Sequence, residues 1–188
     1  MSVAHTHLNP SEEDVLVEGE TFTHTRDNYH GCTILFNPLI NSGIYRFEVS
    51  NEHRFTSIGI ADDSLPFGQD EVPSKYGWTN VVEYMNDGGM HHIGNLDGWI
   101  KGNDPFNKPG DRVALELDMD SSPRTLTFFV NDVEQKNYLT NIPAAVNFYG
   151  YIFDFGASFK VVKFKRLAKI TSTHGFLSKK WEWGKEWK

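Results

Sequence analysis

The sequence contains a single cysteine, Cys32, and this scarcity excludes several classes of protein. One cysteine cannot form an internal disulfide, nor supply the several thiolates of a RING or B-box zinc module. The glycosylation pattern Asn-x-Ser/Thr occurs only as Asn9-Pro10-Ser11, which the proline blocks. Both observations favour a reducing compartment, and we expect a cytoplasmic protein. Because Cys32 alternates with Ile34 and Phe36, we interpret it as a small core residue rather than a nucleophile.

The chain also lacks long apolar runs and a surplus of basic residues. No run approaches the roughly 18 apolar residues that a membrane helix needs, and the polar N-terminus has no signal-peptide pattern. The 25 acidic and 18 basic residues give a net charge of −7, which argues against nucleic acid and anionic lipid as partners. We therefore expect no membrane span and no nucleic-acid partner. We also expect a monomer.

What the chain does have is aromatic residues, at 14%, and apolar positions that alternate with polar ones. Within 110–131, Val113, Leu115 and Leu117 alternate with polar residues, and Ser121-Ser122-Pro123 separates this run from a second alternating run. A period of two predicts a β-hairpin with one buried face and one solvated face. A hairpin cannot bury its apolar face alone, so we expect a second layer of strands.

The same pattern predicts strands along most of the chain, with no convincing helix before residue 166. Glycine- and proline-rich loops are predicted at 62–78 and 94–110, and loops of such length are usually functional. We predict a flexible lead-in over 1–13, an all-β sandwich over 14–167 and a Trp/Lys-rich extension over 168–188. We expect the extension to pack back on the domain or to be flexible, rather than to enter a membrane interface. The predicted strands are 15–17, 21–25, 31–37, 43–50, 55–61, 81–85, 90–93, 148–155 and 158–165.

Three segments, in this order, resemble SPRY (B30.2-like) domains. The first is Ser42–Val49, SGIYRFEV, followed by Ser57–Ala61, SIGIA. The second runs from Gly110 to Asp120, and the third is Leu126–Asn131, LTFFVN, with Asp132 where the family usually has glycine. The resemblance implies an all-β fold, a bent β-sandwich of two antiparallel sheets of the concanavalin-like jelly-roll type. It also implies a non-enzymatic module, an adaptor or scaffold, that recognises a protein or short peptide through loops at one end.

Within that family the chain is most similar to adaptors that carry a suppressor-of-cytokine-signalling box, which have a Gly-Trp like Gly77-Trp78. Their peptide pocket is lined by a loop aromatic, an arginine near the first strands and a late Val-Trp-Gly. The matching positions here are Phe67, Arg26 and Asp154-Phe155-Gly156. Because Asp and Phe replace Val and Trp, the same peptide is not expected to bind. The expected apolar anchors are Phe67 and Phe155. Arg26 is the expected hydrogen-bond donor, and Tyr76 and Trp78 the expected pocket wall.

The alternative to a peptide-recognition module is a carbohydrate-active sandwich, either a glycosidase or a lectin. It rests on the three alternating carboxylates Glu116, Asp118 and Asp120. Retaining glycosidases on a related jelly roll carry Glu-x-Asp-x-x-Glu, and they need two carboxyl groups about 5–5.5 Å apart. Here the third acid is an Asp, one position early. The simpler interpretation is the solvated face of a half-buried strand. A groove lined with aromatics over this face would favour the alternative.

The histidines show no pattern that we expect to bind a metal. His91 and His92 are adjacent, so on a strand their side chains point to opposite faces and do not chelate one ion. The sequence also lacks a phosphate-binding glycine loop, a nucleophile elbow and a convincing catalytic triad. We therefore expect no metal, no cofactor and no enzymatic activity.

Overall fold

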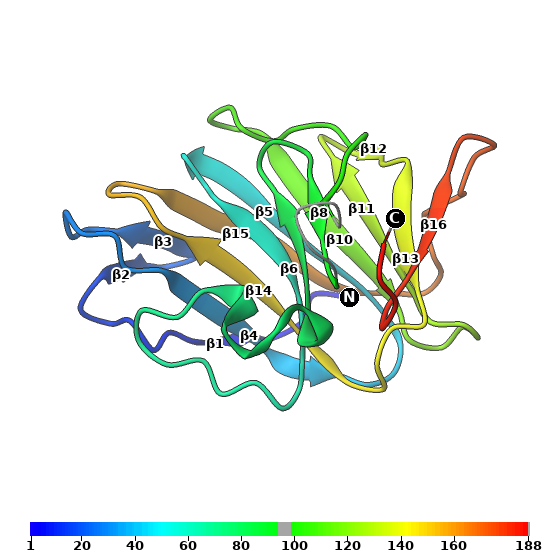
Figure 1. Ribbon diagram of the computed structural model, residues 1–188, viewed down its shortest axis with the longest axis horizontal. Coiled ribbons are helices and arrows are strands. Elements are labelled where there is room, and N and C mark those ends of the chain that lie inside the picture. Colours follow the sequence, from blue (N-terminus) through cyan, green and yellow to red (C-terminus); the bar gives the residue numbers. More distant parts are fainter. Residues whose placement is uncertain (94–98, 188) are drawn as a thin grey trace.

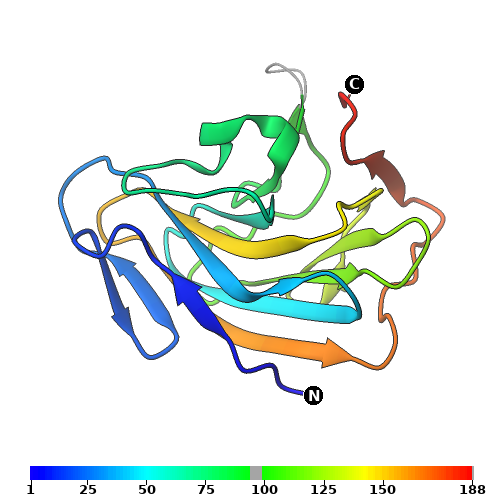
Figure 2. The ribbon, with the colours of Figure 1, turned by 90° about the horizontal axis from the view of Figure 1, so that it is seen from below.

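Two β-sheets face each other in the computed structural model, which describes residues 1–93 and 99–187 (Figures 1 and 2). Neighbouring strands within each sheet are antiparallel, except for one parallel pair at the edge of the larger sheet. The seven-stranded sheet has the order β1 (Thr6–Leu8), β4 (Cys32–Ile40), β14 (Val146–Ile152), β6 (Ser57–Asp62), β7 (Val81–Met85), β8 (Met90–His91) and β9 (Trp99–Ile100).

The nine-stranded sheet contains the hairpin that the sequence predicts. One further strand, β12 (Val133–Glu134), pairs with β11 (Thr125–Val130) outside the main strand order of this sheet. Short 3₁₀ helices occur outside the sheets, at η1 (Pro73–Tyr76) and η2 (Trp78–Asn80). These are the only helical turns among the described residues. The order is β16 (Lys179–Glu182), β13 (Asn137–Thr140), β11 (Thr125–Val130), β10 (Arg112–Asp118), β5 (Ile44–His53), β15 (Ser158–Leu167), β3 (Thr21–His24) and β2 (Val15–Glu18). The fold is thus the all-β sandwich of two sheets that the sequence predicts.

The core lies between the sheets and is rich in phenylalanine. In the hairpin, Leu115 of β10 lies opposite Phe128 of β11, and both are fully buried, as the alternation predicts. Phe47 of β5 stacks on Phe148 of β14 with ring centroids 5.1 Å apart, and this pair joins the two sheets. Offset aromatic pairs of this kind add to the stabilisation from buried apolar area. Cys32 is buried in the same core, as expected for a packing residue.

One glycine and one turn show how local sequence fixes the strands. Gly59 in β6 allows close backbone approach, because a Cβ there would lie 1.9 Å from the carbonyl oxygen of Val82. The turn between β11 and β12 places Asn131 and Asp132 at φ values of 49° and 68°. Such values suit a two-residue hairpin turn, which asparagine, aspartate and glycine tolerate. Asp132 therefore keeps the tight turn that glycine usually forms.

The N-terminal residues differ from the flexible lead-in predicted for 1–13. β1 pairs with β4, with Leu8 opposite Leu35, and the Val3 N–H donates to the Phe164 carbonyl over 2.8 Å. This pairing uses backbone groups, so the polar side chains of the segment gave no sign of it. The predicted strand 158–165 is β15, which lies inside its sheet between β5 and β3.

The polar face of β10 is not the solvated face that the sequence predicts. The Glu116 side chain is buried and accepts hydrogen bonds from the N–H groups of Thr171 and Ser172 at 2.7 and 3.0 Å, and from the Thr171 hydroxyl. Asp118 is also buried and accepts the N–H of Asp120 at 3.0 Å. The reason is non-local, because the C-terminal extension folds back over this face.

The extension ends in β16, which pairs in parallel with β13. The Trp181 indole N–H donates to the Asn137 side chain over 2.9 Å, and Trp187 is buried in the main core. Of the two expectations for residues 168–188, packing back on the domain is therefore the one observed. Among the described residues, no helix has the length and apolar character needed to cross a membrane.

Candidate functional site

Three loop connections gather at one end of the sandwich, towards the left in Figures 1 and 2. They are the β3–β4 loop (25–31), the β5–β6 loop (54–56) and the β14–β15 turn (153–157). Backbone hydrogen bonds hold the first and third together, since the Gly156 N–H donates to the His24 carbonyl over 2.8 Å. We call these three loops the end surface. Of the predicted site residues, Arg26, Asp154, Phe155 and Gly156 lie on it.

Large aromatic side chains are exposed on the end surface. Phe155 is 56% exposed at the tip of the β14–β15 turn, where Gly156 takes a φ of 78°. Tyr29, in the β3–β4 loop, is 82% exposed and its ring centroid lies 6.0 Å from that of Phe153. A turn tip next to a positive-φ glycine has no strand neighbour to cover it, which accounts for the exposure of Phe155.

Both arginines of the end surface lie next to a carboxylate. Arg26 lies 3.3 Å from the Glu13 carboxylate, and Arg54 lies 2.9 Å from the Asp154 carboxylate. Both pairs are solvent-exposed, and exposed ion pairs contribute little to stability. These arginines can therefore change partners at low cost when a ligand arrives.

Asp14 supports the β3–β4 loop from below. Burial raises the pKa of its carboxyl group, but hydrogen bonds from Asn28 (2.8 Å) and His30 (3.0 Å), with the charges of His30 and Arg26, outweigh burial. The pKa of Asp14 therefore lies below its ordinary value, and the carboxylate stays ionised. This carboxylate thus links the loop that carries Arg26 and Tyr29 to the residue before β2.

Phe67, Tyr76 and Trp78 lie elsewhere, on the outer face of the seven-stranded sheet. They belong to the segment 63–80, which covers a second apolar cluster that includes Tyr149 and Val81. The ring centroids of Phe67 and Tyr76 are 5.8 Å apart. The structure therefore does not bring these three residues together with Phe155 in one pocket.

Trp78 and Tyr76 are held by contacts within the chain. The Trp78 ring stacks on His91 with centroids 3.7 Å apart, which is a packing contact. The Tyr76 hydroxyl lies 2.9 Å from the Glu71 carboxylate. The Gly68 N–H, which donates to Glu71, lowers the pKa of this carboxyl group most strongly, and the Tyr76 hydroxyl and the Lys75 charge lower it further against the effect of burial.

Sequence reasoning missed Tyr29 and Arg54 as residues of the end surface. Tyr29 directly follows Asp27-Asn28, a pair of residues typical of turns. A large aromatic residue in such a polar turn indicates an exposed side chain, and this pattern would have identified Tyr29. Arg54 has a φ of 46°, in the tight connection between β5 and β6. No sequence signal marks this arginine, because its role depends on the position of Asp154, 100 residues away.

Over Glu116, Asp118 and Asp120, the described residues form no groove lined with aromatic side chains, as the carbohydrate interpretation would require. Glu116 is only 1% exposed, beneath Thr171 and Ser172. A cavity of about 730 Å³ beside Asp120 is bounded by 119–124 and 141–142, and none of these residues is aromatic. Within the described part of the chain, no group of three or more acidic, histidine or cysteine side chains is placed to hold a metal ion. His91 and His92 contact different partners, Trp78 and Trp183 respectively.

Comparison with known proteins gives matches among solved structures alone. No protein-family model and no curated protein matches the sequence. The SPRY domain of human HERC1 aligns over 79% of this chain and 92% of its own, with 20% identity and a TM-score of 0.57. A human SPRY domain aligns over 85% and 96%, with 14% identity and a TM-score of 0.60. The TRIM65 PSpry domain aligns over 81% and 85%, with 10% identity and a TM-score of 0.59. The fold of this chain is therefore that of SPRY domains.

Proposed function

We propose that this chain is a non-enzymatic module that recognises a protein or short peptide through its end surface. The observation that carries the proposal is the exposure of Tyr29 and Phe155 on neighbouring loops that are held by hydrogen bonds. Exposed aromatic side chains are favoured at recognition sites, because they bury a large area with few rotatable bonds. The SPRY-like fold supports this class of function by analogy of architecture.

Each part of the end surface has a role in this proposal. Phe155 and Tyr29 are the apolar anchors, and Arg26 and Arg54 are hydrogen-bond donors whose present acidic partners a ligand carboxylate or carbonyl can replace. Asp154 orients Arg54 in the free protein. Phe67, Tyr76 and Trp78 are not part of this surface, and the module acts as an adaptor or scaffold in the cytoplasm.

The test separates binding from folding. Phe155→Ala removes an exposed ring, so its free energy of unfolding should change by less than about 1 kcal/mol, as for most exposed residues. Loss of a hot-spot anchor should weaken binding by about 2 kcal/mol or more, roughly thirtyfold in Kd. The immobilised full chain captures partners from a cell lysate, and the Kd of a recovered partner is then measured by calorimetry.

Phe176→Ala is the matched control, because Phe176 is a fully exposed phenylalanine in the C-terminal extension. It should leave both stability and binding unchanged. If Phe155→Ala binds every recovered partner as tightly as the unchanged chain, the end surface is not the recognition site.

A further inference from the structure

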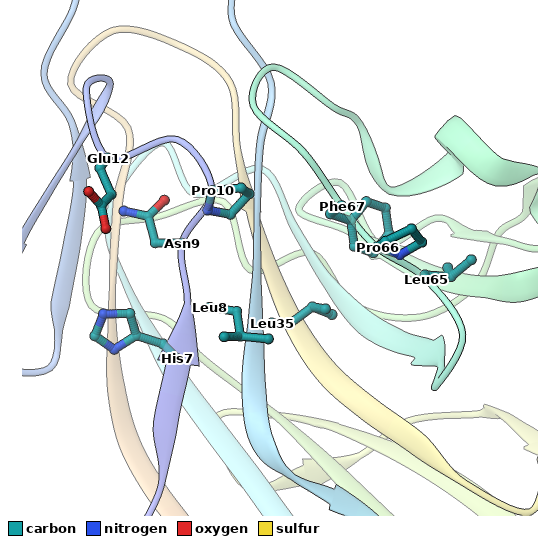
Figure 3. A pocket seen from close by; sticks show the side chains of 9 residues that line it. All are labelled: His7, Leu8, Asn9, Pro10, Glu12, Leu35, Leu65, Pro66 and Phe67. Atoms are coloured by element: carbon teal, nitrogen blue, oxygen red, sulfur yellow. The ribbon is translucent and has the colours of Figure 1, made fainter.

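A cavity of about 400 Å³ opens on the outer face of the seven-stranded sheet, and its described lining residues lie outside the three loops of the end surface. Figure 3 shows Leu8 and Leu35 at its centre, with Leu65, Pro66 and Phe67 on one side and His7, Asn9 and Glu12 on the other. Pro10 completes the lining. We call this cavity the β1 groove. Its volume falls within the range of pockets that bind small ligands and peptide side chains, roughly 300–1,000 Å³.

The β1 groove exists because the covering segment stops short of the sheet edge. Leu8, Leu35 and Tyr149 lie opposite one another across β1, β4 and β14, so their side chains share the outer face. The segment 63–80 covers Tyr149, which is fully buried, and Leu35, which is nearly so. Leu8, at the end of this row, remains 54% exposed. An apolar floor is therefore left open between β1 and Phe67.

One wall of the β1 groove is acidic. Glu12 is exposed, and among the described residues it has no ion-pair partner. Asp63, two residues before Leu65, is also exposed and forms no ion pair within residues 1–93 and 99–187. Among the described residues that line the groove, none is a lysine or an arginine. The local charge therefore favours a cationic group next to an apolar one.

We propose that the β1 groove binds a peptide segment in which a bulky apolar residue is flanked by lysine or arginine. The apolar side chain lies over Leu35, between Leu8 and Phe67, and the flanking cation pairs with Glu12. This is a second binding surface, and its occupancy does not depend on the end surface.

The proposal is tested with three acetylated and amidated pentapeptides, Gly-Lys-Leu-Lys-Gly, Gly-Glu-Leu-Glu-Gly and Gly-Lys-Ala-Lys-Gly. Each is titrated into the ¹⁵N-labelled full chain at low salt, and amide chemical shifts are followed. The Lys-Leu-Lys peptide should produce saturable shifts at Leu8, Leu35 and Phe67, and bind at least tenfold more tightly than the other two. Raising the salt concentration should weaken its binding, because the ion pair is exposed.

A charge reversal supplies the decisive variant. Glu12→Lys should weaken the Lys-Leu-Lys peptide at least tenfold and strengthen the Glu-Leu-Glu peptide. Glu18→Lys is the matched control, because Glu18 is an exposed carboxylate on β2 outside the groove, and it should change neither affinity. Phe155→Ala should also leave both affinities unchanged, which separates this proposal from that of the end surface.

Three results would overturn the proposal. The first is equal affinity for all three peptides, and the second is a set of shifts confined to 25–31 and 153–157. The third is the absence of saturable shifts at millimolar peptide. If the absence of shifts accompanies a concentration-dependent dimer in sedimentation, a second copy of the chain occupies the groove instead.

Discussion

Glu83 is a carboxyl group buried on the outer face of the seven-stranded sheet, where the Ser57 hydroxyl donates to it. Burial raises the pKa of Glu83 to about 7, against the lowering effect of the Ser57 hydrogen bond. The folded state therefore holds this proton more tightly than the unfolded state, whose pKa is 4.5. The contribution of Glu83 to the free energy of unfolding is therefore fully present below pH 4.5, and it is lost as the pH rises through 7.

Glu83→Gln should remove this pH dependence, because the amide stays neutral and still accepts the Ser57 hydrogen bond. Between pH 5.5 and 8 the unchanged chain should lose about 2 kcal/mol of unfolding free energy more than the variant, at about 1.36 kcal/mol per pKa unit. Urea unfolding at both pH values measures this difference. Equal losses in the two proteins would mean that Glu83 is ionised throughout this range.

Phe128 and its neighbour Thr127 test the register of the central hairpin. Phe128 is fully buried between the sheets, so Phe128→Ala should cost about 3–5 kcal/mol. Thr127 points to the other face, and its buried hydroxyl has no hydrogen-bond partner within the described structure. Thr127→Ala should therefore cost well under half as much. A denaturant titration that gives equal losses would show that the register is wrong.

At the scale of elements, the C-terminal extension is fastened to the larger sheet by carboxylates. Glu116 accepts hydrogen bonds from the N–H groups of Thr171 and Ser172, and Glu134 accepts those of Thr173 and His174 at 2.7 and 2.8 Å. Charge-assisted hydrogen bonds to backbone N–H groups are among the stronger ones. The carboxylate alternation that suggested a glycosidase is thus used to hold a neighbouring segment.

Glu116→Ala should loosen the extension locally. Loss of a charged acceptor from buried N–H groups costs about 1–3 kcal/mol, so the amides of Thr171 and Ser172 should exchange hydrogen at least about fivefold faster. Hydrogen exchange followed by NMR measures each amide. Glu134→Ala provides the comparison, because it should accelerate Thr173 and His174 instead. Unchanged exchange at Thr171 in Glu116→Ala would contradict this account.

Local patterns predicted those elements whose strands have one apolar face. The hairpin of β10 and β11 and the strands predicted at 15–17 and 21–25, which are β2 and β3, are confirmed. β1 was not predicted, because its pairing with β4 relies on backbone groups. The burial of Glu116 was not predicted either, because Thr171, which covers it, lies 55 residues further along the chain. At the site, Phe155 was predicted as the last residue of a strand over 148–155, whereas β14 ends at Ile152 and Phe155 lies in the turn that follows. Trp78, predicted as a pocket wall, is packed on His91.

At the scale of the whole molecule, charge is divided between the sandwich and its extension. Residues 1–167 carry 23 acidic and 13 basic residues, and 168–188 carry two acidic and five basic residues. The extension is therefore positively charged and lies on a negatively charged body. Attraction of this kind between exposed charges is screened by salt over about 10 Å at 0.1 M.

Salt should therefore loosen the extension more than the sandwich. Between 20 and 500 mM NaCl, amide exchange at 179–183 should accelerate about twofold, while exchange in β5 and β14 stays constant. Sodium chloride is compared with an equal osmolality of sucrose, which does not screen charge. Acceleration in sucrose as well, or none in salt, would show that hydrogen bonds and packing alone hold the extension.

The parallel pairing of β16 with β13 also bears on aggregation. Without β16, the backbone of β13 would present unpaired N–H and carbonyl groups along the rim of the larger sheet, and such rims recruit strands from other molecules. β16 occupies those groups and puts Lys179 and Lys180, both exposed, at the new rim. Lysines at a sheet rim discourage further strand addition, because a second molecule would have to bring its own lysines beside them. We therefore expect that a chain lacking the extension would associate sheet to sheet more readily than the full chain.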